Sequence, residues 1–369
     1  MRSPREQRGA APTEGGRPDV VANAEPSEVC PAEIRTMSEL RPSTGPQRCQ
    51  TAQGHHGHAF AGRPVAMTSA RPILPNRYWL LTRRCVQRTF LMRPDEAMNN
   101  VFLYCLFEAA LRFDIRLLLA QMMSNHHHVV FHDPSDHVVD FYHRFHTNLA
   151  KCINVLRGRW ENALSAEPTC LVELADADAV LDKLVYTATN PVKDHLVEQV
   201  HHWPGPKTVR ALLEGRTMRA KRPAFFFRED GPMPEEVEYT FTLPPELGDS
   251  SILLEQLRDR IAGIEAACAR DRQQRGRCIV GRGRITRQSW RESPTSHEPR
   301  RNLRPRVAAR SKWARIEALQ RNQEFAREYR AAWMRWRVGL PAIFPPGTYA
   351  LARYANVKVR DGTSPDVTA

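Results

Sequence analysis

The spacing of strand-like and helix-like segments between about residues 77 and 193 limits the folds open to this chain. Three segments with apolar residues at helical spacing lie at about 96–113, 137–156 and 177–190. Asp95 and Asp176 are suitable N-caps for the first and third helices, and Pro191 is expected to close the third. Four further segments have the aliphatic and aromatic content of strands: RYWLLTRR, IRLLLAQMM, HHHVVFH and TCLVELA.

The order of these segments is strand, helix, strand, strand, helix, strand, helix. This order predicts an α+β fold with a ferredoxin-like domain, in which an antiparallel sheet has helices on one face. The domain is expected to span residues 72–206.

Net charge points to the kind of partner. The 369 residues carry 54 Lys and Arg against 41 Asp and Glu, a formal net charge of +13. Such a balance favours a polyanion, most plausibly nucleic acid. No run approaches the roughly 18 apolar residues of a membrane span, and no apolar signal segment is present near the start. The eight cysteines are scattered without a C-x-x-C pair, which is typical of reduced thiols in a cytoplasmic protein. With the positive charge and the lack of an apolar span, this predicts a nucleoid-associated protein without a membrane partner.

Composition divides the remainder of the chain. Residues 1–70 are rich in Pro, Gly, Ser, Arg and Glu and are expected to be disordered, with Met67 as a candidate true start. Residues 207–269 form an accessory segment with strand candidates in AFFFRED and VEYTFTLP and a helix from about Ile252. Residues 270–312 carry fourteen Arg or Lys against three acids and are expected to be a basic linker. A C-terminal amphipathic helix and tail are expected over 313–369.

Three consecutive histidines, His126, His127 and His128, begin the third strand-like segment. Side chains alternate between the two faces of a strand, so His126 and His128 share one face and His127 points to the other. Two imidazoles at this spacing can bind one divalent cation. Histidines that only satisfy hydrogen bonds, or a chance cluster, explain the triplet about as well.

A second pair of polar residues lies on the third helix. Leu181, Leu184, Val185 and Ala188 make its apolar stripe, and Tyr186 lies roughly 160° from the centre of that stripe. Asn190 follows one turn later on the face of Tyr186. A surface tyrosine and a helix-terminal asparagine are the simpler interpretation of this pair taken alone.

Together the two motifs resemble a known family. MSNHHHVVF is similar to the Met-Pro-Asn-His-hydrophobic-His signature of the HUH single-tyrosine transposases, and KLVYTATNPVKDHLVEQVHHWP is similar to the Tyr-x-x-x-Asn-Pro-Val-Lys segment of its REP-associated tyrosine transposases. TRRCVQRTF resembles the basic turn of that family. The sequence departs from the signature at Ser124, where relatives have proline, and at His127, where they have a hydrophobic residue. About 160 C-terminal residues also exceed the minimal catalytic unit of the family.

The resemblance implies a role for each matching residue. His126, His128 and Asn190 would hold Mg²⁺ or Mn²⁺, and Tyr186 would be the nucleophile that forms a 5′-phosphotyrosine with single-stranded or hairpin DNA. Arg83, Arg84 and Arg88 are candidates for phosphate contacts, and Trp79 and Tyr78 for base stacking. A solvated turn and core aromatics account equally well for these five residues.

The resemblance also implies a homodimer. Two other functions stay open. One is a domesticated relative that binds hairpin DNA or RNA without cutting it. The other is a structural zinc site at the histidines.

Overall fold

The computed structural model describes residues 70–296 and 305–361. The expectations for residues 1–69, including the candidate start at Met67, therefore lie outside the described residues. In chain order the elements are β1 (Arg77–Arg84), η1 (Val86–Arg88), α1 (Glu96–Arg112), β2 (Arg116–Met122), β3 (His126–Asp133), α2 (Val138–Leu156), β4 (Cys170–Leu174), α3 (Ala177–Lys193), η2 (Val200–His202), α4 (Thr208–Glu214), β5 (Thr217–Lys221), β6 (Glu236–Thr240), η3 (Pro245–Leu247), α5 (Ser250–Arg275), α6 (Arg282–Arg287), β7 (Val307–Ala308), α7 (Lys312–Arg337) and α8 (Ala350–Ala355).

A five-stranded mixed sheet with the order β2-β3-β1-β4-β7 forms the centre of the molecule. The first four strands in this order are antiparallel to their neighbours, and only β7 joins in parallel, beside β4. The predicted α+β class and the predicted order of the first seven elements are confirmed. Strands β2 and β4 are buried almost from end to end, which explains why their sequences are mostly apolar runs rather than alternating ones.

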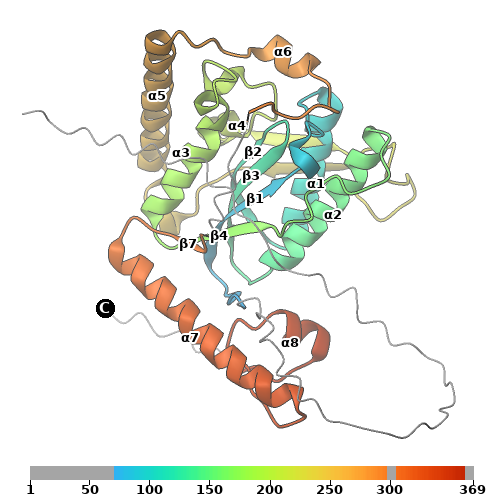
Figure 1. Cartoon of the computed structure of the whole chain (residues 1–369), viewed down its shortest axis with the longest axis vertical. Helices are drawn as coiled ribbons and strands as arrows, with labels where there is room; N and C mark the ends of the chain where they lie inside the picture. Colours follow the sequence, from blue (N-terminus) through green and yellow to red (C-terminus); the bar gives the residue numbers. More distant parts are fainter. Residues whose placement is uncertain (1–69, 297–304, 362–369) are drawn as a thin grey trace, which may run out of the picture.

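Helices cover both faces of this sheet. His127 on β3 packs against Phe102 of α1 and Phe145 of α2, whereas His128 faces Tyr186 of α3. The expectation that helices lie on one face is therefore wrong. Figure 1 shows α1 and α2 on one side of the strands and α3 and α5 on the other. The physical reason is that both faces of the sheet are apolar, so α3, which follows β4, is needed to bury the second face.

Side-chain caps begin α1 and α3 as expected. The carboxylate of Asp95 accepts a hydrogen bond from the Met98 backbone, and that of Asp176 accepts one from the Ala179 backbone. The prediction that Pro191 closes α3 is wrong, because the helix continues to Lys193. Proline removes one backbone donor but keeps a helical φ, so the last turn still forms through the bond from Asp194 N to Asn190 O, 3.1 Å long.

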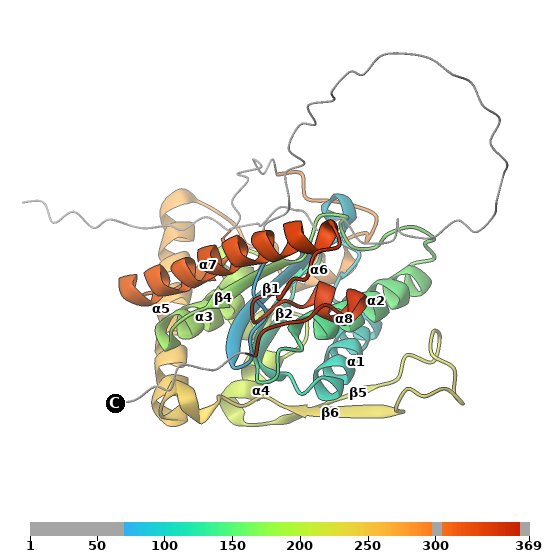
Figure 2. The same cartoon turned by 90° about the horizontal axis from the view of Figure 1, so that it is seen from below.

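A two-stranded ribbon of β5 and β6 packs beside α1. β6 overlaps the predicted segment VEYTFTLP, but AFFFRED is not a strand, and the partner strand is Thr217–Lys221 just before it. The phenylalanines lie in a turn where Phe227 packs on Tyr104 of α1, with ring centroids 5.5 Å apart. Figure 2 shows this ribbon at the opposite side of the molecule from α7.

The two long C-terminal helices, α5 and α7, match the positions expected from their amphipathic patterns. Between them, the segment expected to be a basic linker includes the last turn of α5, the short helix α6 and strand β7. None of the six cysteines in the described ranges forms a disulfide. Within residues 70–296 and 305–361, no helix combines the length and apolarity needed to cross a bilayer.

Candidate active site at the start of strand β3

His126 and His128 lie on one face of the sheet, as the alternation of β3 predicts. Their ring centroids are 4.9 Å apart. Nδ1 of His126 is 2.7 Å from Oδ1 of Asn125, and Nδ1 of His128 is 2.8 Å from Oγ1 of Thr82. An amide oxygen only accepts, so Nδ1 of His126 carries the hydrogen and Nε2 keeps its lone pair. Hydrogen bonds at Nδ1 orient metal-binding histidines in this way.

Asn190 reaches the same place from α3. Its side-chain nitrogen Nδ2 lies 3.3 Å from Nε2 of His128. Its oxygen Oδ1 is buried and has no hydrogen-bond partner among the described residues. A buried amide oxygen without a partner is costly, and a bound cation would satisfy it.

Both imidazoles of the pair are neutral in the folded protein. Burial, together with the charges of Arg84 and Lys183, lowers the pKa of His128 to about 3. Burial also lowers the pKa of His126 well below its usual value, with contributions from His128 and Arg84. Neutral imidazole is the form that binds metal.

The residues present fit a divalent cation. They offer two neutral imidazole nitrogens and one amide oxygen, a mixed set that suits Mg²⁺ or Mn²⁺ when water and substrate oxygens supply the remaining ligands. Across residues 70–296 and 305–361, no cluster of three or more His, Cys, Asp or Glu side chains is placed to hold a metal ion. The histidine pair with Asn190 is the candidate metal site that the sequence predicts.

Tyr186 lies against His128, with ring centroids 5.3 Å apart and the rings nearly perpendicular. Its side chain is half-buried rather than directed into solvent. Two ammonium groups from α3 flank its ring: Nζ of Lys183 is 5.5 Å and Nζ of Lys193 is 5.3 Å from the centroid. These lysines stand three residues before and seven residues after Tyr186, a helical spacing from which the sequence could have predicted them.

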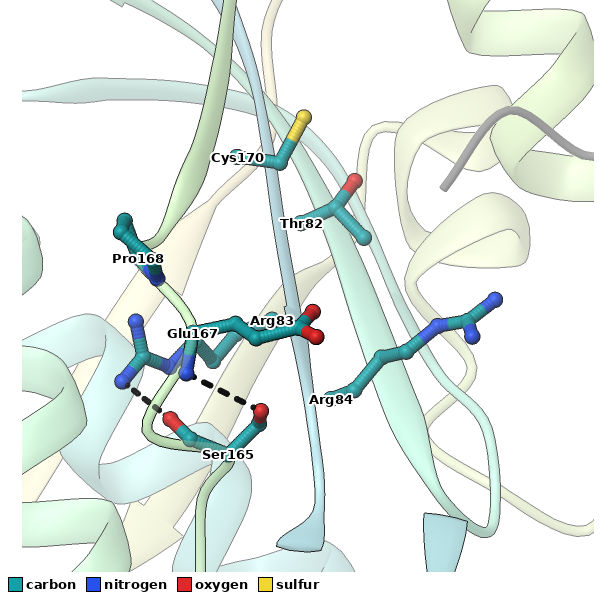
Figure 3. A pocket seen from close by; sticks show the side chains of 7 residues that line it. All are labelled: Thr82, Arg83, Arg84, Ser165, Glu167, Pro168 and Cys170. Carbon is teal, nitrogen blue, oxygen red and sulfur yellow. Dashed lines mark hydrogen bonds between the residues drawn. The ribbon is translucent and has the colours of Figure 1, made fainter. Parts of the chain in front are cut away.

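The two arginines that end β1, Arg83 and Arg84, point to opposite faces of the sheet. Arg84 is paired with His126 in the β1–β3 register and shares its face, whereas Arg83 is paired with His127. Figure 3 shows the two guanidinium groups extending to opposite sides of the strand. Arg83 donates to Thr169 Oγ1 at 2.8 Å and to the Ser165 carbonyl at 2.7 Å, beside a small pocket that also includes Glu167. Arg83 therefore supports the loop before β4 and does not face the histidine pair.

Arg88 stays close to the site. Its backbone carbonyl accepts a hydrogen bond from Asn125, 3.3 Å long, and its guanidinium donates to the Ser296 carbonyl at 3.0 Å. Its charge contributes to the lowered pKa of His126. Arg84 and Arg88 are thus the two predicted phosphate contacts that the structure brings to the histidines.

The predicted stacking residues belong to the core. Trp79 is only 1% exposed, so the expectation that its ring stacks on a base is wrong. It points with Arg83 and His127 toward α1 and α2, where an aromatic ring stabilises the core. Tyr78 is half-buried and stacks on His132, with centroids 4.5 Å apart, and burial raises its pKa to about 12. It stands at the other end of β1 from the histidine pair.

His127 is a polar side chain at a core position, and a second histidine lies within hydrogen-bond distance of it. It is fully buried, and its Nε2 is 3.1 Å from Nε2 of His146 on α2. Burial lowers the pKa of both histidines well below the usual value, so one ring donates and the other accepts in a neutral pair. The middle histidine of the triplet, His127, is structural in this arrangement.

Gln121 on β2 is opposite His128 and shares its face. It also lines a cavity of about 530 Å³ between η2, α4 and α5, within the range of small-ligand pockets. The charged side chains that line this cavity are Lys207, Arg210 and Arg258 together with Glu214 and Glu265. The cavity therefore reaches β2 at Gln121, the residue opposite His128, and the sequence did not indicate it.

Comparisons with known proteins give distant similarity to solved structures alone. No protein-family model matches the chain, and no curated protein matches it. Among solved structures, one of a REP-associated tyrosine transposase bound to a REP hairpin is similar with a TM-score of 0.34 and 15% sequence identity. The match covers 45% of this chain and 95% of that chain. Similarity of this degree marks a distant structural relationship and assigns no role to any residue.

Proposed function

We propose that this chain is a transposase-like enzyme that cleaves and rejoins single-stranded DNA through a covalent bond to Tyr186. The observation that carries the proposal is the meeting of Tyr186, His126, His128 and Asn190 on one face of the sheet. The histidines come from β3, whereas the tyrosine and asparagine come from α3. Two motifs some 60 residues apart in sequence therefore contribute to one site, which a surface tyrosine and chance histidines do not explain.

We also interpret the first six elements as a ferredoxin-like unit. Their order is strand, helix, strand, strand, helix, strand, and the strand order β2-β3-β1-β4 places the first and third strands at the centre. This arrangement places the end of β1 beside the start of β3. Thr82 is therefore paired with His128, and Arg84 with His126.

The chemistry follows from the groups at the site. The phenolic oxygen of Tyr186 attacks a backbone phosphorus and forms a phosphotyrosine, while the bond from phosphorus to the 3′ oxygen breaks and that oxygen leaves as a 3′-hydroxyl with a proton. Lys183 and Lys193 offset negative charge on the phenolate and on the phosphate, and Arg84 orients the phosphate. The reverse attack by a 3′-hydroxyl rejoins the strand and needs no external energy source.

A divalent cation fits this proposal. Held by His126, His128 and Asn190, Mg²⁺ or Mn²⁺ would polarise the scissile phosphate and stabilise its developing charge. The residues around these ligands prepare the site, since Thr82 and Asn125 fix the ring orientations through Nδ1.

The test is a covalent trapping assay. Purified protein is incubated with Mn²⁺ and end-labelled hairpin DNA taken from the sequence that flanks its own gene. A denaturation-resistant adduct is expected for wild type and for the control Tyr354→Phe, which removes the same hydroxyl from an exposed tyrosine of α8. No adduct is expected for Tyr186→Phe or for the double variant His126→Ala/His128→Ala. Retarded complexes without any adduct would instead indicate a protein that binds hairpins without cutting them.

A further inference from the structure

Residues 277–296, here named the arginine strap, cross the edge of the candidate site. The strap contains five arginines and a single acidic residue, Glu292. All five arginines are exposed in the structure: Arg277, Arg282, Arg284, Arg287 and Arg291. It includes α6, which Figure 1 shows near the end of β1.

One end of the strap is bound to the chain that follows α3. The backbone nitrogen of Val280 donates to the His195 carbonyl at 3.1 Å, and that of Gly281 donates to the Leu196 carbonyl at 2.9 Å. Both acceptors lie just beyond Lys193, the last residue of α3, the helix that carries Tyr186. The strap therefore starts its crossing at the end of the nucleophile's helix.

The other end is bound to the turns that border the histidine pair. The side chain of Gln288 donates to Oγ of Ser124 at 2.7 Å, two residues before His126. The backbone nitrogen of Phe90, in the loop after β1, donates to the Glu292 carbonyl at 2.9 Å. The strap thus contacts the loop that follows β1, where Arg84 is the last residue, and the turn that precedes β3, where His126 is the first.

The middle of the strap has a fixed inner and outer side. Ile285 of α6 is 1% exposed, whereas its neighbours Arg284 and Arg287 are exposed. The buried isoleucine anchors α6 to the core and leaves the arginines on the solvent side. Neither Arg282, Arg284 nor Arg287 forms an ion pair within the part of the chain that the structure describes.

We propose that the arginine strap binds the phosphates of the DNA single strand that enters the histidine–tyrosine site. The inference rests on the proposed function, which identifies the polyanion as single-stranded DNA. The contacts and exposed arginines of the strap itself give the position at which that strand binds. Guanidinium groups bind phosphate through paired hydrogen bonds, and a row of them can follow a strand without reading its sequence. The strap adds to Arg84 and Arg88 a set of cations from a distant part of the chain.

Salt dependence of binding tests the proposal. Anisotropy of labelled single-stranded hairpin DNA is measured at increasing salt, with the full chain carrying Tyr186→Phe so that no covalent step intervenes. In that background Arg282→Ala/Arg284→Ala/Arg287→Ala is compared with Arg216→Ala/Arg219→Ala/Arg228→Ala. The control arginines are exposed on or beside the β5–β6 ribbon, which packs by α1 on the opposite face of the sheet.

Each phosphate contact contributes about 0.7 to the slope of log affinity against log salt for a single strand. The strap variant is therefore expected to lose about 2 from the slope and at least about tenfold in affinity at low salt, whereas the control keeps the slope of its parent. An unchanged slope in the strap variant, or an equal loss in the control, would overturn the proposal.

The outcomes separate the strap from the catalytic function. A reduced slope in the strap variant together with no adduct for wild type supports the strap as a binding surface and contradicts catalysis by Tyr186. An adduct for wild type together with an unchanged slope in the strap variant supports the catalytic function and contradicts DNA binding by the strap. Absence of both binding and adduct overturns both proposals.

Discussion

Asn190 on α3 places its side-chain nitrogen 3.3 Å from Nε2 of His128 on β3, while its own oxygen is buried without a partner. If Oδ1 is a metal ligand, Asn190→Ala weakens Mn²⁺ binding by more than the 10- to 100-fold range that is usual for loss of an outer-shell partner. Isothermal titration of the purified protein measures this. Asn190→Asp supplies an anionic oxygen at the same place and is expected to bind at least as tightly as wild type. Equal affinity of the alanine variant and wild type would remove Asn190 from the ligand set.

Thr82 acts on the metal site through His128. Thr82→Val keeps the shape of a buried side chain but removes the hydroxyl that lies 2.8 Å from Nδ1 of His128. The expected result is a loss of Mn²⁺ affinity of about 10- to 100-fold with a folded protein. Thr187→Val is the matched control, because the Thr187 hydroxyl is buried without a hydrogen-bond partner. A loss of the same size in both variants would mean that the effect is general and does not pass through His128.

The lysines beside Tyr186 are expected to affect the rate of adduct formation. Lys183→Ala and Lys193→Ala each remove a charge within about 5.5 Å of the tyrosine ring. Each is expected to slow single-turnover cleavage about tenfold, which corresponds to about 1.4 kcal/mol. Lys151→Ala, on the exposed side of α2, serves as the control. Equal single-turnover rates in all four proteins would show that these ammonium groups do not stabilise the reacting oxygen.

Acid should destabilise the metal-free fold through its buried histidines. The pKa of His127 and of His146 is lowered in the folded state, so below about pH 6.5 the unfolded chain binds protons that the folded chain excludes. Stability is therefore full above the unfolded pKa and falls as pH decreases, by up to about 1.4 kcal/mol per pH unit for each group. The double variant His127→Leu/His146→Leu lacks both groups. Urea unfolding at pH 7 and pH 5 is expected to show a smaller difference for the variant, and an equal difference would contradict the assignment.

Trp79 and Trp160 offer a direct check on the corrected role of Trp79. Trp79 is 1% exposed and Trp160 is 99% exposed. Trp79→Ala is expected to lower the free energy of unfolding by about 3–5 kcal/mol, because it leaves a cavity in the core. Trp160→Ala is expected to change it by less than about 0.5 kcal/mol. Denaturant titrations followed by circular dichroism measure both, and a Trp79→Ala protein of normal stability with weakened DNA binding would restore the stacking role.

Local patterns predicted much of the fold. Short-range rules of spacing and hydrogen bonding predict the caps at Asp95 and Asp176 and the order of the strands along the chain. They also predict that His126 and His128 share one face. The pairing of Tyr186 and Asn190 on one turn of α3 is also local. That these two residues meet the histidines depends on how α3 crosses the sheet, and the resemblance to a family supplied that expectation.

The errors concern long-range packing. Trp79 and Arg83 occur in a strand whose two faces are both covered, so polarity and aromatic content could not show which face each residue takes. AFFFRED has the composition of a strand, but it forms a turn from which Phe227 packs on Tyr104 of α1. The contacts of the arginine strap with Ser124 and Phe90 join positions more than 160 residues apart, and no periodicity in the sequence encodes them.

The site of covalent attachment tests the central claim most directly. The trapped protein–DNA adduct is digested with nuclease and trypsin and analysed by mass spectrometry. The tryptic peptide of residues 184–193, LVYTATNPVK, contains Tyr186 as its only tyrosine. The account predicts a nucleotide joined through its 5′-phosphate to Tyr186 in this peptide. Attachment to another residue, or a well-bound hairpin that never becomes attached, would contradict it.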